Sequence, residues 1–173
     1  YRHELPELYL DQIEVMTSYH SIKDTLEAYK YRSEREKWDR LARFFFDSPT
    51  LQSLKTTEEV LIVPVPMHWS RYILRGYNHI SLLSKIISKH LDIPSRSIMR
   101  SSFSPRQSHL SKEKRLKNRE WGFSLGKWVK IPEIVVLIDD VISTGSTANA
   151  CAKILKDAWV KKVYGLFLAS NRD

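Results

Sequence analysis

The chain has 173 residues, enough for one domain with a core, and its 42% hydrophobic and 28% charged content is typical of a soluble globular protein. No apolar run approaches the ~18 residues of a membrane-spanning helix, no signal peptide is visible, and the single cysteine, Cys151, excludes an internal disulfide. We therefore expect no membrane insertion and a cytoplasmic location. The net charge of +8 favours polyanionic partners such as pyrophosphate, nucleotides or nucleic acid.

Predicted strands and helices alternate along the chain. In chain order, the pattern predicts a strand over 12–19, helices over 22–31 and 35–46, a polar connection over 49–57, a strand over 60–65, a helix over about 78–91, a short strand near 97–100, a long polar segment over 106–119, a strand over 134–138, a helix over 148–158 and a strand over 162–169. This alternation indicates a single α/β domain with a mostly parallel sheet flanked by helices.

The most informative pattern covers residues 134–147. A buried aliphatic strand is followed by two carboxylates, Asp139 and Asp140, and then by a loop that contains Gly145 and four hydroxyl residues: Ser143, Thr144, Ser146 and Thr147. The helix that follows would present unpaired N–H groups and a positive dipole end to a phosphate. Gly145 permits a close backbone approach and can adopt a positive φ if the loop needs one. The aspartates would repel phosphate, but they suit a sugar diol or hydrated Mg²⁺.

An ordinary alternative exists for each part of this pattern. A strand can end in acids, and a serine or threonine can cap any helix. All parts in order within 134–147 favour the phosphate site instead, although the sequence contains neither Gly-x-x-x-x-Gly-Lys-Ser/Thr nor Gly-x-Gly-x-x-Gly. In the same helix, we expect Cys151 to be a small core residue rather than a nucleophile.

Residues 136–147 resemble the phosphoribosyl pyrophosphate motif of type I phosphoribosyltransferases. The resemblance implies that fold, with a small N-terminal hood from about residues 1–35. It implies that Asp139 and Asp140 act in catalysis, face the ribose 2- and 3-hydroxyls and hold Mg²⁺ through water or substrate hydroxyls. It also implies a substrate-binding loop: Val141, Ile142, Ser143, Thr144, Gly145, Ser146 and Thr147.

A second anion site is expected after the strand over 60–65, because neighbouring strand ends converge on one crevice in such sheets. In the resembling enzymes this loop holds pyrophosphate, and here its candidate residues are Pro66, Met67, His68 and Arg75. The basic segment over 106–119 corresponds to a mobile flap in those enzymes. Arg115 would close over the pyrophosphate as a catalytic cation, and Gln107 lies at the base of the flap. The alternative for this segment is a solvated basic helix.

The order Pro-Val-Pro at 64–66, Arg-Gly-Tyr-Asn at 75–78, Gln107, Arg115 with Asn118, and then the phosphoribosyl motif is similar to the ComF family over about residues 12–170. That family is linked to natural competence and DNA uptake. Two features depart from it. The family's usual N-terminal four-cysteine zinc module is absent from this chain, and His79 stands where the family commonly has glutamine.

Two functional hypotheses follow from the residues and the resemblance. The first is a Mg²⁺-dependent phosphoribosyltransferase that binds phosphoribosyl pyrophosphate and transfers to an acceptor that the sequence does not identify. The alternative is a non-catalytic phosphoribosyl pyrophosphate sensor, or a single-stranded DNA-binding accessory protein that works with competence helicase machinery. The basic residues between Arg100 and Glu120 favour DNA as a partner. The sequence does not indicate an oligomeric state.

Overall fold

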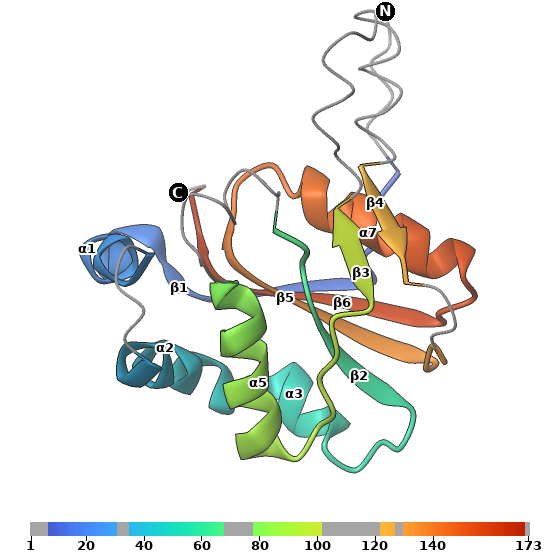
Figure 1. Cartoon of the computed structure of the whole chain (residues 1–173), viewed down its shortest axis with the longest axis horizontal. Coiled ribbons are helices and arrows are strands. Elements are labelled where there is room, and N and C mark those ends of the chain that lie inside the picture. The colour runs from blue at the N-terminus through green and yellow to red at the C-terminus, as the bar shows by residue number, and fades with distance from the viewer. Residues whose placement is uncertain (1–6, 31–34, 68–77, 102–121, 127–129, 172–173) are drawn as a thin grey trace, which may run out of the picture.

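The computed structural model describes residues 7–30, 35–67, 78–101, 122–126 and 130–171 (Figure 1). Within these ranges, four parallel strands form the central sheet in the order β1 (Gln12–Ser18), β6 (Lys162–Ser170), β5 (Ile134–Ile142) and β2 (Val60–Pro64). Two short antiparallel strands, β3 (Met99–Ser101) and β4 (Phe123–Leu125), pair separately. The helices are α1 (Tyr19–Lys30), α2 (Arg35–Phe46), α3 (Pro49–Leu54), α5 (His79–Leu91) and α7 (Ser146–Asp157). The predicted α/β architecture with a mostly parallel sheet is therefore confirmed.

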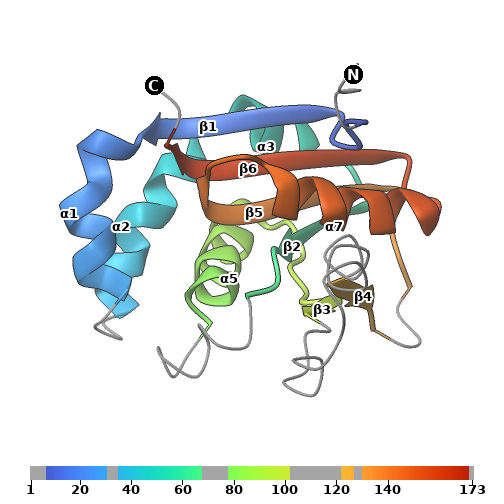
Figure 2. The same cartoon turned by 90° about the horizontal axis from the view of Figure 1, so that it is seen from above.

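Helices cover both faces of the sheet, as parallel strands require. Helix α7 and the β3–β4 pair lie on one face, and α2, α3 and α5 lie on the other (Figures 1 and 2). Strand β5 is buried on both faces: Val136 and Ile138 pack against α2 and α5, whereas Val135 and Leu137 pack against α7. This explains why the sequence of the strand is a continuous apolar run.

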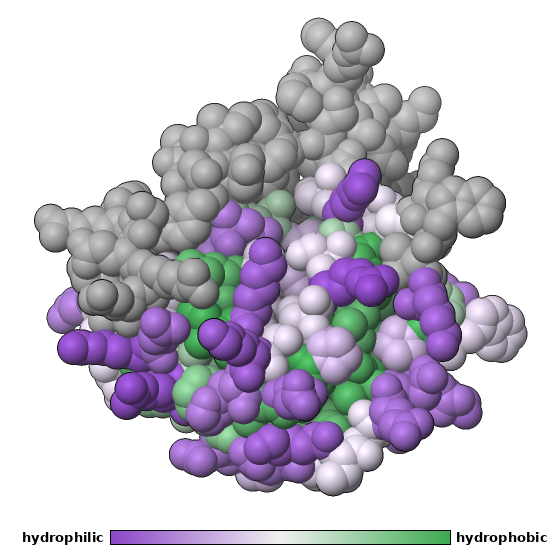
Figure 3. Space-filling view, turned by 60° about the horizontal axis from the view of Figure 1, so that its bottom comes forward, coloured by the Kyte–Doolittle hydropathy of each residue, from purple (hydrophilic) through white to green (hydrophobic). Residues whose placement is uncertain are grey.

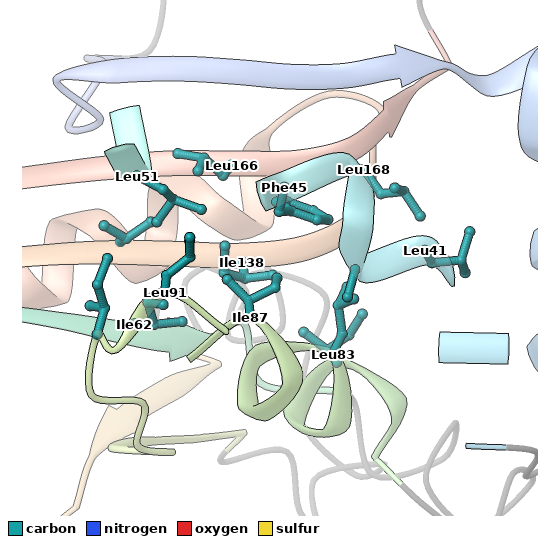
Figure 4. Close-up of a cluster of buried hydrophobic side chains, with 14 of the residues drawn as sticks. Leu41, Phe45, Leu51, Ile62, Leu83, Ile87, Leu91, Ile138, Leu166 and Leu168 are labelled. Carbon is teal, nitrogen blue, oxygen red and sulfur yellow. The ribbon is translucent and has the colours of Figure 1, made fainter. Parts of the chain in front are cut away.

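The larger core lies between the sheet and helices α2, α3 and α5 (Figure 4). Its side chains come from every layer of that face: Leu41, Phe45, Leu51, Ile62, Leu83, Ile87, Leu91, Ile138, Leu166 and Leu168. Figure 3 turns the lower side of the Figure 1 view toward the reader. On this surface, hydrophilic side chains alternate with apolar areas. In the described part of the chain, no helix combines the length and the apolar character needed to cross a bilayer.

The sequence prediction was wrong for part of residues 49–57, which was expected to be a polar connection. Residues 49–54 form helix α3 instead. Ser48 caps the helix, since its Oγ accepts a hydrogen bond from the backbone N–H of Leu51 at 3.2 Å. Pro49 occupies the first helical position, where its missing N–H costs nothing. The buried side chains of Leu51 and Leu54 then anchor this short helix to the core.

Two boundaries near the predicted phosphate loop also differ from the sequence prediction. Strand β5 does not end at Ile138 but continues through both aspartates to Ile142, because it keeps pairing with β6 as far as Ser170. Helix α7 begins at Ser146, two residues before the predicted start. The loop between them is therefore only three residues long, from Ser143 to Gly145. Strand β4 was not predicted, because three residues are too short for a periodicity signal.

Candidate phosphate site at the carboxyl edge of the sheet

The predicted site lies where β5 extends beyond its neighbour β2. The pairing of β2 with β5 ends at Pro64 and Ile138, and the N–H of Val65 donates the next hydrogen bond to the carbonyl oxygen of Ile138 at 2.9 Å. Beyond this point, β5 is paired on the β6 side through Ile142. Asp139 and Asp140 occupy this overhang, and both are partly buried. The carboxyl edge of an open parallel sheet is the usual place for a ligand in such folds.

The two aspartates project to opposite faces of the sheet, because successive side chains alternate along a strand. Asp140 follows the face of Ile138 toward α5, and Asp139 follows the face of Leu137 toward α7. Each carboxylate accepts a hydrogen bond from the next backbone N–H: Asp139 Oδ1 from Asp140 and Asp140 Oδ1 from Val141, both at 2.8 Å. These bonds fix the side chains at the edge of the strand.

The loop after β5 is built to place a helix N-terminus at this edge. Gly145 has a φ of 75° and is the N-cap of α7, so no side chain caps the helix there. By contrast, Ser48 caps α3 and Asn78 caps α5 through their side chains. The hydroxyl oxygens of Thr144 and Ser146 lie 2.9 Å apart, within hydrogen-bonding distance, and both residues are exposed. The N–H of Ser146 donates to Thr144 Oγ1 at 3.3 Å, whereas the N–H groups of Thr147 and Ala148 lie in the first helical turn, where intrahelical partners are lacking. Together with the exposed hydroxyls, they form an anion-binding arrangement.

A hollow of about 650 Å³ lies beside the end of β2. It is lined by residues from β2, the start of α5 and the β3 segment: Pro64, Pro66, Met67, Asn78, Ser97, Met99, Arg100 and Ser101. Two predicted loop residues, Pro66 and Met67, are thus brought to it. Arg100 supplies a cation that the sequence analysis counted only as part of the basic segment. A second hollow of about 620 Å³, between α2 and α5, contains none of the predicted site residues.

Four predicted site residues lie outside the described residues: His68, Arg75, Gln107 and Arg115. Their placement relative to the aspartates, and the flap role of the segment over 106–119, stay predictions. Within residues 1–35, where a hood was expected, β1 is the edge strand of the central sheet next to β6, and α1 follows it beside α2 (Figure 1). The hood role of this segment stays a prediction.

The described residues offer a magnesium ion few direct protein ligands. They contain no group of three or more His, Cys, Asp or Glu side chains close enough to hold a metal. Mg²⁺ prefers oxygen ligands and usually keeps several waters, binding through one or two carboxylates together with substrate phosphates. Asp139 and Asp140 fit that mode of binding, in which substrate and water would supply the remaining oxygens.

His79 is the site residue whose role the sequence left open. It is 2% exposed, and its Nε2 lies 3.1 Å from Oδ2 of Asp140. The two residues are 61 positions apart, so no local pattern could reveal this contact. The sequence signals were its position at the start of a predicted helix, directly after Asn78, and its departure from the glutamine common in the resembling family.

Cys151 is a buried residue on the core-facing side of α7, as expected from the sequence. Burial raises the pKa of its thiol strongly, and the negative charge of Asp139 raises this pKa further. The thiol therefore stays protonated and unreactive at neutral pH. A nucleophilic role for Cys151 does not fit this environment.

The fold and the site together define a mixed α/β domain in which a parallel sheet presents an acid pair and a glycine–hydroxyl loop at its carboxyl edge. This arrangement is consistent with the type I phosphoribosyltransferase fold.

Comparison with known proteins narrows this class to a family. The chain is 36% identical over 146 residues to Competence protein F of Haemophilus influenzae, a match that covers 78% of this chain and 62% of the relative. It is 31% identical over 150 residues to Competence protein ComFC of Streptococcus pneumoniae, a match that covers 86% of this chain and 63% of the relative. It is 33% identical over 96 residues to DNA utilization protein YhgH of Escherichia coli K12, covering 54% and 42%. No family model matches the chain.

The chain belongs to the ComF family. It spans 62% and 63% of the length of the first two relatives, which is less than two thirds of each.

Proposed function

We propose that this chain binds phosphoribosyl pyrophosphate with Mg²⁺ at the carboxyl edge of its sheet and transfers the phosphoribosyl group to an acceptor. The observation that carries the proposal is the junction of β5 and α7. An acid pair, a left-handed Gly145 and a helix start with no side-chain cap follow one another over eight residues, from Asp139 to Ser146. This combination suits a ligand that has a phosphate at one end and a diol beside it.

The 5-phosphate would lie on the N-terminus of α7. The N–H groups of Ser146, Thr147 and Ala148 belong to the first helical turn, where intrahelical partners are lacking. The N–H of Ser146 donates to Thr144 Oγ1 at 3.3 Å, and a bound phosphate would take the place of that acceptor. The hydroxyls of Thr144, Ser146 and Thr147 are the neutral donors, and these residues are exposed. A dianion here gains both hydrogen bonds and the positive end of the helix dipole.

The ribose would lie across the edge of β5, where Asp139 and Asp140 reach it from the two faces. Their carboxylates accept hydrogen bonds from the 2- and 3-hydroxyls and stabilise the positive charge that develops on the ring. The C1–oxygen bond breaks with its electron pair leaving on pyrophosphate, a nitrogen of the acceptor forms the new bond to C1, and the acceptor gives up its proton to solvent. Bound magnesium would neutralise charge on the departing pyrophosphate.

The pyrophosphate would occupy the hollow beside the end of β2. Pro66 and Met67 line it, and Arg100 supplies positive charge on its β3 side. Asn78, at the start of α5, lines the same hollow, and the next residue, His79, contacts Asp140. Neighbouring residues of α5 therefore reach the hollow and Asp140, which supports placing both ends of one substrate here. His68, Arg75, Gln107 and Arg115 are proposed to complete this side of the site.

We also propose a role in natural competence or DNA uptake. Its support is the ComF family and the printed names of relatives, which are competence proteins and a DNA utilization protein. The net charge of +8 favours a second candidate function, direct binding of single-stranded DNA. Such binding would be nearly independent of sequence and would weaken steeply with salt, with a slope of about −0.7 per phosphate contact. Affinity that is flat between low and physiological salt would exclude it.

Calorimetric titration with phosphoribosyl pyrophosphate, with and without Mg²⁺, tests the proposal. We expect binding that requires the metal and is weakened at least about tenfold by Asp139→Asn. Glu58→Gln is the matched control, because it removes one exposed carboxylate just before β2, at the opposite end of that strand from the site. No binding by the unmodified chain, or equal binding by both variants, would refute the site.

Pyrophosphate release with a panel of nitrogenous bases then separates an enzyme from a sensor. Release with one base, lost in Asp139→Asn, supports transfer. Tight binding without release for any base would favour the non-catalytic sensor instead.

A further inference from the structure

We propose that His79 is a positioning residue that holds the carboxylate of Asp140 in place at the ribose end of the site. The inference rests on the proposed function, because it assigns a role to a contact within that site. Its starting point is a partly buried hydrogen bond between two elements that are far apart in the sequence, β5 and α5. His79 Nε2 and Asp140 Oδ2 are 3.1 Å apart.

The backbone brings His79 to this point through the start of α5. Asn78 caps the helix, and its side-chain oxygen accepts the N–H of Ser81 at 3.0 Å. His79 is therefore the first helical residue. It lies on the face of α5 that also carries the buried Ile80, Leu83 and Ile87. Since this face packs on the sheet, the imidazole is directed toward β5 rather than toward solvent.

The imidazole is held from a third element as well. The ring of Trp38, in α2, lies against it with a centroid distance of 5.1 Å and an interplanar angle of 31°. Trp38 is completely buried, and the His79 side chain is 3% exposed. A ring packed in this way has few rotamers open to it. Helices α2 and α5 thus fix the imidazole, and the imidazole in turn reaches the strand.

The bond constrains Asp140 on both of its oxygens. Oδ1 accepts the N–H of Val141 at 2.8 Å, and Oδ2 faces His79 Nε2. When Asp140 is ionised its carboxylate only accepts hydrogen bonds, and the tautomer of His79 with its proton on Nε2 donates to it. The side chain of Asp140 is 15% exposed, so a sugar hydroxyl or a metal-bound water can approach it. Asp140 is therefore oriented before a ligand arrives.

This arrangement follows a general feature of ligand and metal sites. A residue that hydrogen-bonds a ligating side chain fixes its orientation, and removing that residue typically weakens binding by about 10- to 100-fold. A carboxylate that must be ordered at the moment of binding loses part of the interaction to that ordering. His79 removes this cost at Asp140, on the α5 face, whereas Asp139 lies on the opposite face and accepts the backbone N–H of Asp140.

The test compares substitutions that differ in whether they can still donate to Asp140. His79→Gln places an amide N–H at nearly the same reach, whereas His79→Asn is one methylene shorter and His79→Leu has no donor. We expect near-normal affinity for phosphoribosyl pyrophosphate with Mg²⁺ in His79→Gln and a loss of about tenfold in the other two. Ile87→Val is the control, since it loosens the same buried face of α5 about two turns away. If His79→Leu does not fold, the difference in affinity between His79→Gln and His79→Asn tests the positioning role.

A double-mutant cycle shows whether His79 acts through Asp140. In an Asp140→Asn background, His79→Leu should cost little further affinity. The ¹⁵N resonance of Nε2 in the ligand-free protein gives an independent readout, and Asp140→Asn should shift it. If the wild-type chain does not bind phosphoribosyl pyrophosphate but Asp140→Asn shifts the Nε2 resonance, the proposed function is refuted and the contact between His79 and Asp140 is confirmed. Wild-type binding with equal affinity in all three His79 variants would overturn the positioning role.

Discussion

Gly145 permits a quantitative test of the loop that opens α7. Its φ of 75° lies in the left-handed region, which costs a residue with a side chain about 1–2 kcal/mol. A Cβ at this position would meet only Ile142, at 3.5 and 3.9 Å from two side-chain carbons, which is ordinary contact. The cost of Gly145→Ala therefore comes from the backbone alone. Alanine also reduces the conformational entropy of the unfolded chain, which stabilises the folded state by about 0.4–1 kcal/mol and offsets part of this cost.

The net expectation for Gly145→Ala is a loss of about 1 kcal/mol in the free energy of unfolding, which corresponds to about 2–4 °C in Tm for a domain of this size. Urea unfolding followed by circular dichroism measures it. Gly145→Asn is the matched control, because asparagine tolerates the left-handed region better, and it should lie between alanine and wild type. An alanine variant as stable as wild type would refute the conformation assigned to Gly145.

Three further predictions concern the rest of the fold. The free energy of unfolding of wild type, relative to that of Cys151→Ala, should fall by about 1.4 kcal/mol per pH unit above pH 9, because the raised pKa keeps the folded thiol protonated while the unfolded thiol ionises. Urea melts in which the stability difference between the two proteins stays constant up to pH 10 would contradict this. Burial opposes the ionisation of Asp11, but hydrogen bonds from Lys156 and the Val163 N–H outweigh it and lower the pKa of this carboxyl below 3.8. Asp11→Asn should therefore lower the free energy of unfolding by about 1 kcal/mol at pH 7, and this loss should vanish as the pH falls below 3.8. Gly165→Ala would place a Cβ 3.0 Å from a ring carbon of Phe167 and should lower the free energy of unfolding by about 1–3 kcal/mol, as measured by thermal unfolding. A substitution to alanine on the exposed surface of α7 should not have this cost.

The central part of the fold could be predicted because its sequence signals are long and local. The aliphatic run of β5 is buried on both faces, and the second predicted helix, 35–46, has the same bounds in the structure. Gly145 was expected to allow a positive φ, and it has one. These features depend on periodicity and on a single residue type, which a sequence displays directly.

The features that were missed depend on tertiary contacts. Helix α3 has six residues, too few for a helical period, and it is stabilised by the Ser48 cap and by burial. Ser48 also donates to Glu14 of β1 at 2.9 Å, a contact across 34 positions. The pairing of His79 with Asp140 is likewise nonlocal. The extension of β5 to Ile142 follows from pairing with β6, which no window around the aspartates could show.

The candidate site was predicted in part. The aspartates, the loop over 143–147, Pro66 and Met67 all lie near the carboxyl edge of the sheet, but the alternation that sends the two aspartates to opposite faces was not anticipated. Arg100 entered the sequence analysis only as charge, because its proximity to Met67 depends on the path of β3. The role of Arg115 as a closing cation stays a prediction.

The most direct test of the central claim is the amide ¹H–¹⁵N spectrum of the chain, titrated with phosphoribosyl pyrophosphate in Mg²⁺. We expect the largest shifts at the N–H groups of Gly145, Ser146 and Thr147, with smaller ones at Asp139 and Asp140 and little change at the far end of α7. Ribose without phosphate, as the control ligand, should leave the first three unchanged. Shifts confined to the hollow between α2 and α5, or saturation without any change at the start of α7, would contradict the account.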